Sequence, residues 1–511
     1  MQLLNAKQIK QWDQFTIDNE PVSSIDLMER ASMACAGWIK QYFNQKPLHI
    51  FCGPGNNGGD GLAIARLLKK DGFDVHVFIV NTTRNFSTDF LINLQRLKAI
   101  NNITINYIDT LSDIPSIPNG SVTIDALFGT GLNREVDSLY KELIIAINNT
   151  TNPVIAIDIS SGLLCDGSSK EFVAIKATHT LTFECLKLAF LLPENEPYFG
   201  QVHVLNIGLK KDFLASISSV LNITDNETIR AIYKPRSSFS HKGNYGHALL
   251  LAGSFGKMGA AVLSTKGCLR SGAGLVTAHV PEKGIDIIQT NVPEAMCFAD
   301  YSEKHLSTID YELKNYSAIG IGPGIGQHAE TTALLLHLIS SYKKPLVIDA
   351  DALNIIAQNK NWLSLIPKGS ILTPHPKEFD RLFNKSKNDF EKINTALSKA
   401  KEFGIIIVLK GHRSLIALPS GKGYFNTSGN AGMATGGSGD VLTGIITGLL
   451  AQGYMPEQAA ILGVYLHGLA GDKAAEKYGM DAMIAGDIIE GLTQIRLGLT
   501  ALILKGQIAQ F

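Results

Sequence analysis

The stretch "HIFCGPGNNGGDGLAIARLLKK", residues 49–70, passes from an apolar run through a glycine-rich segment into a helical pattern. This succession predicts a strand, a tight turn and a helix. Gly53, Gly55 and Gly58 satisfy G-x-G-x-x-G. The acidic residue that dinucleotide dehydrogenases place about 20 positions later is missing, because the next predicted strand ends at Asn81. The glycines therefore either bind a different ligand or form a tight turn without a ligand.

The same alternation of strand and helix patterns continues through all 511 residues. Strands are predicted within residues 48–53, 74–80, 121–129, 153–160, 179–184 and 201–208, and then within 246–254, 274–280, 316–322, 344–351, 369–374 and 404–411. Residues 221–236 begin polar and unpatterned, which places a domain boundary near Leu221. Alternating strands and helices favour parallel sheets covered on both faces. We predict two three-layer α/β/α domains, residues 1–220 and 221–511.

The amino-acid composition limits the kinds of molecule that this chain is expected to bind. Lys+Arg and Asp+Glu number 46 each, so the chain has no basic excess for a nucleic-acid backbone. The six cysteines are scattered without a CxxC pair, which indicates reduced thiols and argues against a structural zinc site. The amphipathic first residues lack the features of a signal peptide, and no apolar run approaches the roughly 20 residues that span a bilayer. We expect a cytoplasmic protein that binds small molecules and neither nucleic acid nor membrane.

Three loops of the first domain carry polar residues directly after predicted strands. These residues are Asn57, Asp60, Asp125, Asp158 and Ser161. Because parallel strands end at one edge of a sheet, the loops are expected to meet in one crevice. Oxygen-bearing side chains gathered in this way suit a hard cation and proton transfer. Each residue taken alone would more often cap a helix or form a turn.

The second domain has its own glycine-rich segment, "NAGMATGGSGDVLTG", residues 430–444. The first amides of a helix lack internal partners and carry partial positive charge, so they bind anions such as phosphate. Asp440 would repel a resting phosphate, but it suits a base that deprotonates a hydroxyl attacking phosphorus. The alternative is that Asp440 is only the N-cap of the helix. The chain lacks G-x-x-x-x-G-K-[ST], since Leu251 stands where the first glycine would precede Gly256 and Lys257.

Other polar residues of this domain follow predicted strands. Asp349 and Asp351 end "LVIDADALN", and "LTPHPKEFDRL" presents His375 and Glu378. Lys410 to Arg413 follow the strand of "VLKGHRS". Taken alone, His375 would more often be a histidine whose hydrogen bonds are satisfied within the fold, and Lys410 would more often be a solvated surface charge. The segment "GIGPGIGQ" misses the dinucleotide fingerprint at Ile325 but permits close backbone approach to a ligand.

The segments "GPGNNGGDGLAIARLL", "DALFGTGL" and "IDISSG" resemble the Rossmann-like epimerase module of the bifunctional NAD(P)H-hydrate repair enzymes, over roughly residues 1–210. The resemblance implies that Asn57, Asp125 and Ser161 bind K⁺ and that Asp158 contacts the reacting ring and is catalytic, assisting proton movement. The positions matched to substrate binding are Asn56, Asn57, Gly58, Gly59, Asp60, Gly129, Thr130, Gly131, Leu132, Asn133, Arg134, Glu135 and Asp158. Lys187 resembles a lysine usual in the later segment. The chain departs from the family at Ser160, where a proline is common, and around Lys187, where the usual Pro and Gly are missing.

The segments "FSHKGNYGHALLLAGS", "GIGPGIG", "VIDADALN", "LTPHPKEFDRL", "VLKGHRS" and "GNAGMATGGSGDVLTGIITGLLAQG" resemble the ribokinase-like dehydratase of the same family, over about residues 224–500. By this resemblance, Ala260, Gly324, His375 and Asp440 contact the hydrated dinucleotide, and Asp440 is the base. The adenine nucleotide would bind Lys410, Gly411, His412, Arg413, Ser414, Asn430, Thr435, Gly436, Gly437, Ser438 and Gly439.

Together these resemblances imply a metabolite-repair enzyme. The first domain would interconvert the R and S epimers of hydrated NAD(P)H, with K⁺ bound. The second would dehydrate the S epimer with ADP and Mg²⁺, giving AMP and phosphate. A homo-oligomer is also implied. The alternatives are an ATP-dependent ribokinase-like small-molecule kinase, and a binding or scaffolding protein whose first domain has lost catalysis.

Overall fold

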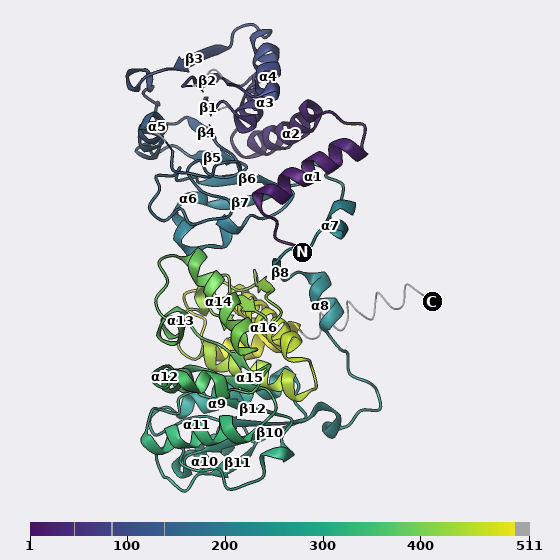
Figure 1. Ribbon diagram of the computed structural model, residues 1–511, viewed down its shortest axis with the longest axis vertical. Coiled ribbons are helices and arrows are strands. Elements are labelled where there is room, and N and C mark those ends of the chain that lie inside the picture. Colours follow the sequence, from purple (N-terminus) through teal and green to yellow (C-terminus); the bar gives the residue numbers. More distant parts are fainter. Residues whose placement is uncertain (45, 83–84, 137, 496–511) are drawn as a thin grey trace. The chain divides into compact units, whose positions relative to one another are not determined.

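The computed structural model describes residues 1–44, 46–82, 85–136 and 138–495, which form two compact units (Figure 1). The N-terminal unit comprises residues 2–219 together with 388–390. The C-terminal unit comprises Met1, residues 220–387 and, within the described part of the chain, residues 391–495. Each unit is built on a largely parallel sheet, which confirms the predicted α/β class.

The sheet of the N-terminal unit has the order β3-β2-β1-β4-β5-β6-β7, and all its strands are parallel. Its strands are β1 (Leu48–Cys52), β2 (Val75–Val80), β3 (Thr104–Ile108), β4 (Val122–Ala126), β5 (Val154–Ile157), β6 (His179–Phe183) and β7 (Gln201–Leu205). The strand order reverses between β1 and β4. In open parallel sheets this reversal leaves a crevice at the carboxyl ends of the two strands, where ligands bind.

Helices cover both faces of this sheet. They are α1 (Ala6–Asn19), α2 (Ser24–Tyr42), α3 (Asn56–Lys70), α4 (Thr88–Lys98), α5 (Ser138–Asn148), α6 (Glu196–Phe199) and α7 (Asp212–Ser216). Alternate strand residues pack in different clusters: Ile50 joins apolar residues of α2, α3 and α4, whereas Phe51 joins those of α5. The resulting helix, sheet and helix layers are visible in Figure 1.

Glycines allow the turn after β1 to pass against the loop after β4. A Cβ on Gly53 would lie 1.9 Å from the carbonyl oxygen of Leu127, and one on Gly58 would lie 1.8 Å from that of Gly53. A Cβ on Gly61 would lie 2.6 Å from the Cβ of Ala126. Only glycine fits at these contacts, so the start of α3 is held directly over the switch point.

The sheet of the C-terminal unit has the order β11-β10-β9-β12-β13-β14-β15-β16-β17-β8. Its strands are β8 (Leu221–Ile223), β9 (His247–Leu251), β10 (Leu275–Val280), β11 (Met296–Ala299), β12 (Ala318–Ile321), β13 (Leu346–Ile348), β14 (Ile371–Leu372), β15 (Ile406–Leu409), β16 (Leu415–Ala417) and β17 (Gly423–Phe425). Only β16 runs antiparallel to its neighbours. The sequence suggested that the stretch beginning at Leu221 is irregular. Its first residues instead form β8, which pairs with β17.

The helices of this unit are α8 (Asn226–Ile232), α9 (Met258–Ser271), α10 (Ile285–Asn291), α11 (Ala329–Ser341), α12 (Ala350–Gln358), α13 (Pro376–Phe383), α14 (Asp389–Phe403), α15 (Ser438–Ala451) and α16 (Pro456–Tyr478). One large apolar cluster joins α9, α15 and α16 to one face of the sheet. Leu249 and Leu251, which alternate with the residues of that cluster along β9, are also fully buried. Both faces of the sheet are therefore covered.

The described residues contain no helix long and apolar enough to cross a bilayer. All six cysteines are free, as their scattered spacing predicted.

Helices α9 and α15 meet along a glycine seam. A Cβ on Gly444 would lie 2.0 Å from the carbonyl oxygen of Ser264, and one on Gly448 would lie 2.0 Å from the hydroxyl of Ser271. From the other helix, a Cβ on Gly267 would lie 2.8 Å from the carbonyl oxygen of Val441. The seam fixes α15, and with it the glycine-rich segment that leads into this helix.

We predict that Gly444→Ala destabilises the C-terminal unit, because the added methyl group forces the two helices apart. Overpacking of this kind costs about 1–3 kcal/mol. Differential scanning calorimetry should show a lower Tm for this unit. Gly259→Ala is the control, since its Cβ would enter open space on α9. Equal Tm values for Gly444→Ala and Gly259→Ala would contradict the prediction.

Candidate active sites

A cavity of about 1220 Å³ lies at the switch point of the N-terminal unit. Its walls come from α1, the first part of α2, the turn after β1 and the loop after β4. Of the predicted substrate positions, the lining includes Asn56, Asn57, Asp60, Gly129, Thr130, Gly131, Leu132, Asn133, Arg134, Glu135 and Asp158. Gly58 and Gly59 are buried in the first turn of α3. The three loops that the sequence predicted to converge do so here.

The side chains of Asp125 and Ser161 are joined beneath the loop after β4. Asp125 is fully buried, and its carboxylate accepts hydrogen bonds from the Ser161 hydroxyl at 2.6 Å and the Ser161 amide at 2.8 Å. The same hydroxyl lies 3.3 Å from the carbonyl oxygen of Phe128. Burial raises the pKa of Asp125 to about 6, while its hydrogen bonds from Ser161 and Leu127 oppose the increase.

Asn57 lies on the other side of the same loop. A Cβ on Gly129 would lie 3.5 Å from its side-chain oxygen. Asn57 is 8% exposed, and its Nδ2 has no hydrogen-bond partner among the described residues. Carboxylate, hydroxyl, amide and carbonyl oxygens are ligands for hard cations. The set Asn57, Asp125 and Ser161 therefore has the donor chemistry of a hard-cation site.

Asp158 follows β5 and forms an ion pair with Lys187. Its carboxylate accepts a hydrogen bond from Lys187 Nζ at 2.6 Å, and Asp158 adopts a φ of 67°, which is unusual for a residue other than glycine. Lys187 is fully buried and also donates to the Thr182 hydroxyl. Burial opposes its charge, but the Asp158 carboxylate raises the pKa of Lys187. The ammonium therefore fixes the carboxylate at the cavity wall.

Ser160, where the family commonly has proline, is fully buried and donates a hydrogen bond to the Tyr198 carbonyl at 2.7 Å. The Ser160 hydroxyl thus holds this turn by a hydrogen bond, in place of the proline that is common here. Lys187 is held as well, although the usual Pro and Gly around it are missing.

Sequence reasoning missed two acids that line this cavity, Asp13 of α1 and Glu184 after β6, and Asp13 is the one with a strongly shifted pKa. Burial raises its pKa to about 7, and the Asp158 carboxylate contributes to the increase while Lys187 opposes it. Burial also raises the pKa of Asp60 well above its usual value, with further contributions from Asp158 and Asp13. A signal for Asp13 was present in the sequence. It stands four residues after Ile9 and beside Trp12, on the apolar face of an amphipathic helix, where an acid is out of place.

The second site lies at the start of α15. The N-cap of this helix is Gly437, and Asp440 is the third residue of the helix, so the alternative that Asp440 is only an N-cap is wrong. Gly437 has a φ of 91°, and a Cβ there would lie 2.4 Å from Leu263. A side chain at Gly437 would therefore both strain the backbone and clash. Gly436 before it is exposed, and Thr435 accepts a hydrogen bond from the Ser438 amide.

A buried carboxylate organises this site. Asp349, directly after β13, is 1% exposed and accepts hydrogen bonds from Lys410 Nζ at 2.8 Å and from the Thr443 hydroxyl at 2.7 Å. A Cβ on Gly439 would lie 3.4 Å from Lys410 Nζ. Burial and the Asp349 carboxylate raise the pKa of Asp440 to about 6, while Lys410 opposes the increase. The structure therefore brings together Lys410, Gly439 and Asp440, with Asp349 and Thr443 supporting them.

Of the predicted substrate positions, His375 lies near Lys410, and Gly324 packs against Ala260. His375 is the N-cap of α13, and burial followed by the charge of Lys410 lowers its pKa. Gly324 has a φ of 65°, and a Cβ there would lie 3.0 Å from that of Ala260. Asp351 accepts a hydrogen bond from the Gly326 amide at 2.9 Å and raises the pKa of Asp440.

The predicted nucleotide segments are tied to two neighbouring elements. Residues 410–414 form the turn between β15 and β16, where Ser414 donates to the Gly411 carbonyl and His412 lies in the turn. Arg413 donates to the Thr427 carbonyl at 2.6 Å. Asn430 donates to Asp472 of α16 at 3.0 Å, and the Ser438 carbonyl lies 2.9 Å from the ring of His467, which is also in α16. Sequence reasoning missed Asp472 and His467, because a polar residue on a long helix has no distinguishing local signal.

Family models match both units. The model described as "YjeF-related protein N-terminus" matches residues 24–189, and the model described as NAD(P)H-hydrate dehydratase matches residues 248–494.

Curated relatives match almost the full length of the chain. A bifunctional NAD(P)H-hydrate repair enzyme of Moorella thermoacetica is 35% identical over 97% of this chain and 96% of its own. The enzyme of the same name from Escherichia coli is 32% identical, over 96% of this chain and 93% of its own. A solved structure of the ADP/ATP-dependent NAD(P)H-hydrate dehydratase of Bacillus subtilis is 30% identical, covers 54% of this chain and 98% of its own, and has a TM-score of 0.48. The chain thus belongs to the bifunctional NAD(P)H-hydrate repair enzymes.

Proposed function

We propose that this chain repairs hydrated NADH and NADPH in two steps on its two units. Residues 1–220 interconvert the R and S epimers, and residues 221–511 dehydrate the S epimer with ADP. Family membership over nearly the whole chain supports the pairing of these activities. The observation that carries the proposal is the group of Lys410, Asp440 and the start of α15, which combines a base, a cation and an anion-binding helix end.

The dehydration begins with a hydroxyl next to the ring nitrogen of the hydrated nicotinamide. Asp440 takes the proton of this hydroxyl as the oxygen attacks the terminal phosphorus of ADP, and AMP leaves. The partial positive charge of the first amides of α15 and the Lys410 ammonium stabilise the transferred phosphoryl group. The nitrogen lone pair then expels phosphate, and loss of a ring proton restores the reduced nicotinamide.

The nucleotide binds residues 410–414 together with Asn430 and residues 435–439, with Mg²⁺ on its phosphates. Lys410 and Gly439 lie side by side, which supports a phosphate position between them. Gly324, Ala260 and His375 contact the hydrated dinucleotide on the side of Asp440. The support for this division is that the pKa of His375 responds to Lys410 and Asp349 and that the loop of Gly324 is hydrogen-bonded to Asp351 through the Gly326 amide.

The epimerase site is the cavity lined by Asp13 and Asp158. Asp158, held by Lys187, faces the reacting ring, and Asp13 exchanges a proton with the substrate or with water in the cavity. The support for this assignment is that both acids line one cavity and that Asp13 has a pKa near neutrality, where a group transfers protons efficiently. When bound, K⁺ offsets the buried charge of Asp125. Asn57, Asp125 and Ser161 would hold it.

The decisive experiment follows the absorbance of reduced nicotinamide in an equilibrated mixture of hydrate epimers, with Mg²⁺ and either ADP or ATP. We expect the absorbance to rise beyond the amount that the S epimer alone can supply, and to do so faster than spontaneous epimerisation allows. Replacing K⁺ with choline should slow the epimerisation. Recovery that stops at the S fraction would refute the epimerase assignment. A stable phosphorylated product without recovered NADH would instead identify a kinase.

Asp440→Asn should retain nucleotide affinity but lose turnover by a factor on the order of 10²–10⁴, because an amide cannot act as a base. In the wild type the base works deprotonated, so the dehydration rate should fall as the pH drops through about 6. Initial rates with the S epimer measure both effects, and nucleotide titration measures affinity. Asp286→Asn, at an exposed position in the first turn of α10, is the control. Full turnover in Asp440→Asn would refute the assignment.

Asp13→Asn should slow epimerisation on the order of 10²-fold and remove a rate transition near pH 7. Epimerisation is measured alone by NMR exchange between the R and S epimers without nucleotide. Asp18→Asn, at an exposed position on the same helix, should leave the profile unchanged. If Asp13→Asn slowed the reaction but kept the transition near pH 7, another group would be responsible for it.

A further inference from the structure

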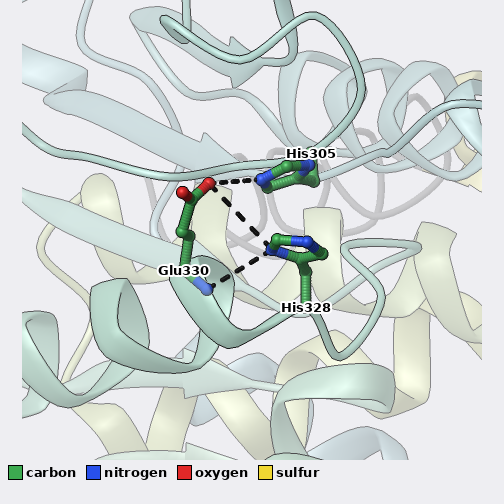
Figure 2. A group of neighbouring side chains, drawn as sticks. All are labelled: His305, His328 and Glu330. Atoms are coloured by element: carbon green, nitrogen blue, oxygen red, sulfur yellow. Dashed lines mark hydrogen bonds and ion pairs between the residues drawn. The ribbon is translucent and has the colours of Figure 1, made fainter.

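Two histidines and a glutamate lie together on the C-terminal unit, at the start of α11 (Figure 2). His305 Nε2 lies 2.6 Å from Glu330 Oε2, and His328 Nδ1 lies 4.0 Å from the same oxygen. The two imidazole rings stack with centroids 3.8 Å apart. One potential ligand atom from each of the three side chains lies within 4.8 Å of the other two.

The loop that carries His305 is held by a buried carboxylate. Asp300 is 3% exposed and accepts hydrogen bonds from the amides of Ser302 and Ser307 at 2.9 and 2.7 Å. The hydroxyl of Ser307 also donates to Asp300, and Leu306 beneath the loop is fully buried. The backbone on both sides of His305 is therefore fixed.

A second contact fixes the loop against α11. The hydroxyl of Thr331 donates to the Leu306 carbonyl at 2.6 Å. Thr331 and Leu306 directly follow Glu330 and His305 in the sequence. His328 is the N-cap of the same helix, and its Nδ1 accepts a hydrogen bond from the Glu330 amide at 3.4 Å. The hydrogen bond between Thr331 and Leu306 thus fixes the distance between the His305 loop and the start of α11, the two segments that carry the three side chains.

The orientation of His305 suits a metal ligand. Its Nδ1 lies 3.1 Å from the Ser302 hydroxyl, which leaves Nε2 directed at Glu330. Metal-binding histidines commonly use their second nitrogen in this way, because the outer hydrogen bond fixes the ring. We propose that His305, His328 and Glu330 form a site for a first-row transition-metal dication such as Zn²⁺. Two imidazoles and one carboxylate suit Zn²⁺, Co²⁺ or Ni²⁺ better than Mg²⁺.

The site is linked to the loop of Gly324 through Ser254 and Phe255. The Phe255 amide donates to the Lys304 carbonyl at 2.8 Å, and the hydroxyl of the adjacent Ser254 donates to the Gly324 carbonyl at 2.7 Å. His328 follows the same glycine-rich loop four residues after Gly324. A bound metal therefore clamps the His305 loop to the end of the glycine-rich loop. This metal differs from the Mg²⁺ that accompanies the nucleotide.

The test titrates the chelator-treated full-length chain with Co²⁺, followed by displacement with Zn²⁺. We expect the visible absorption of an imidazole-bound Co²⁺ ion and its loss on addition of Zn²⁺. His328→Asn removes the imidazole but keeps an N-cap residue, and Glu330→Gln and His305→Gln remove the other ligands with little change in size. Each should weaken binding by at least about tenfold. His337→Asn, at an exposed position on α11, is the matched control and should bind like the wild type.

Thermal unfolding supplies a second readout that does not depend on activity. Zn²⁺ should raise the Tm of the C-terminal unit in the wild type and in His337→Asn, because a ligand of the folded state stabilises that state, but not in His328→Asn. Wild-type Co²⁺ affinity in both His305→Gln and His328→Asn would overturn the proposal by placing the ion elsewhere. Absence of a Co²⁺ signal and of a Tm shift in the wild type would also overturn it. Neither result would bear on the repair reaction.

Discussion

Both sites depend on one geometric constraint, the parallel register of neighbouring strands. Such strands end at a common edge about 4.8 Å apart, so residues just beyond their ends come within reach of one another. In the C-terminal unit, Asp349 follows β13 and Lys410 follows β15, and their 2.8 Å hydrogen bond passes over the end of β14. In the N-terminal unit the same edge places Asp125, at the end of β4, against Ser161, beyond β5. Residues distant in sequence thus become neighbours without any long connecting loop.

The two units use a similar electrostatic device. In each, a lysine is paired with one acid, and a second acid nearby has a raised pKa. Lys187 pairs with Asp158 while Asp13 has a pKa of about 7, and Lys410 pairs with Asp349 while Asp440 has a pKa of about 6. The first carboxylate forms an ion pair with its lysine, and burial together with the charge of that carboxylate raises the pKa of the second acid. Each site therefore contains a carboxylate held by a lysine and a neighbouring acid whose raised pKa suits proton exchange near neutral pH.

The central strands of both sheets were predictable because both their faces are buried and their sequences are continuously apolar. The strands that the sequence did not reveal are β3 and β11, each at one edge of its sheet, and β16, β17 and β8, which form the other end of the second sheet. Their residues are more exposed, as in β11, or the strands are only three residues long, as in β16. The loop residues of the sites were predictable because they follow strands. Asp13 and Asp472 were not identified, since they lie on helices and only the tertiary fold brings them to a site.

The positive φ of Asp158 has a consequence for the substitutions that this position can accept. At a φ of 67°, glycine, asparagine and aspartate are the residues that the backbone tolerates best. Of these three, only aspartate carries a negative charge to pair with the buried Lys187. The conformation of the chain and the chemistry of the site therefore select the same residue for independent reasons. Asparagine or glycine here would keep the backbone conformation of the turn but would leave the buried Lys187 ammonium without its counter-ion, so the stability of the fold and the chemistry of the site both retain aspartate.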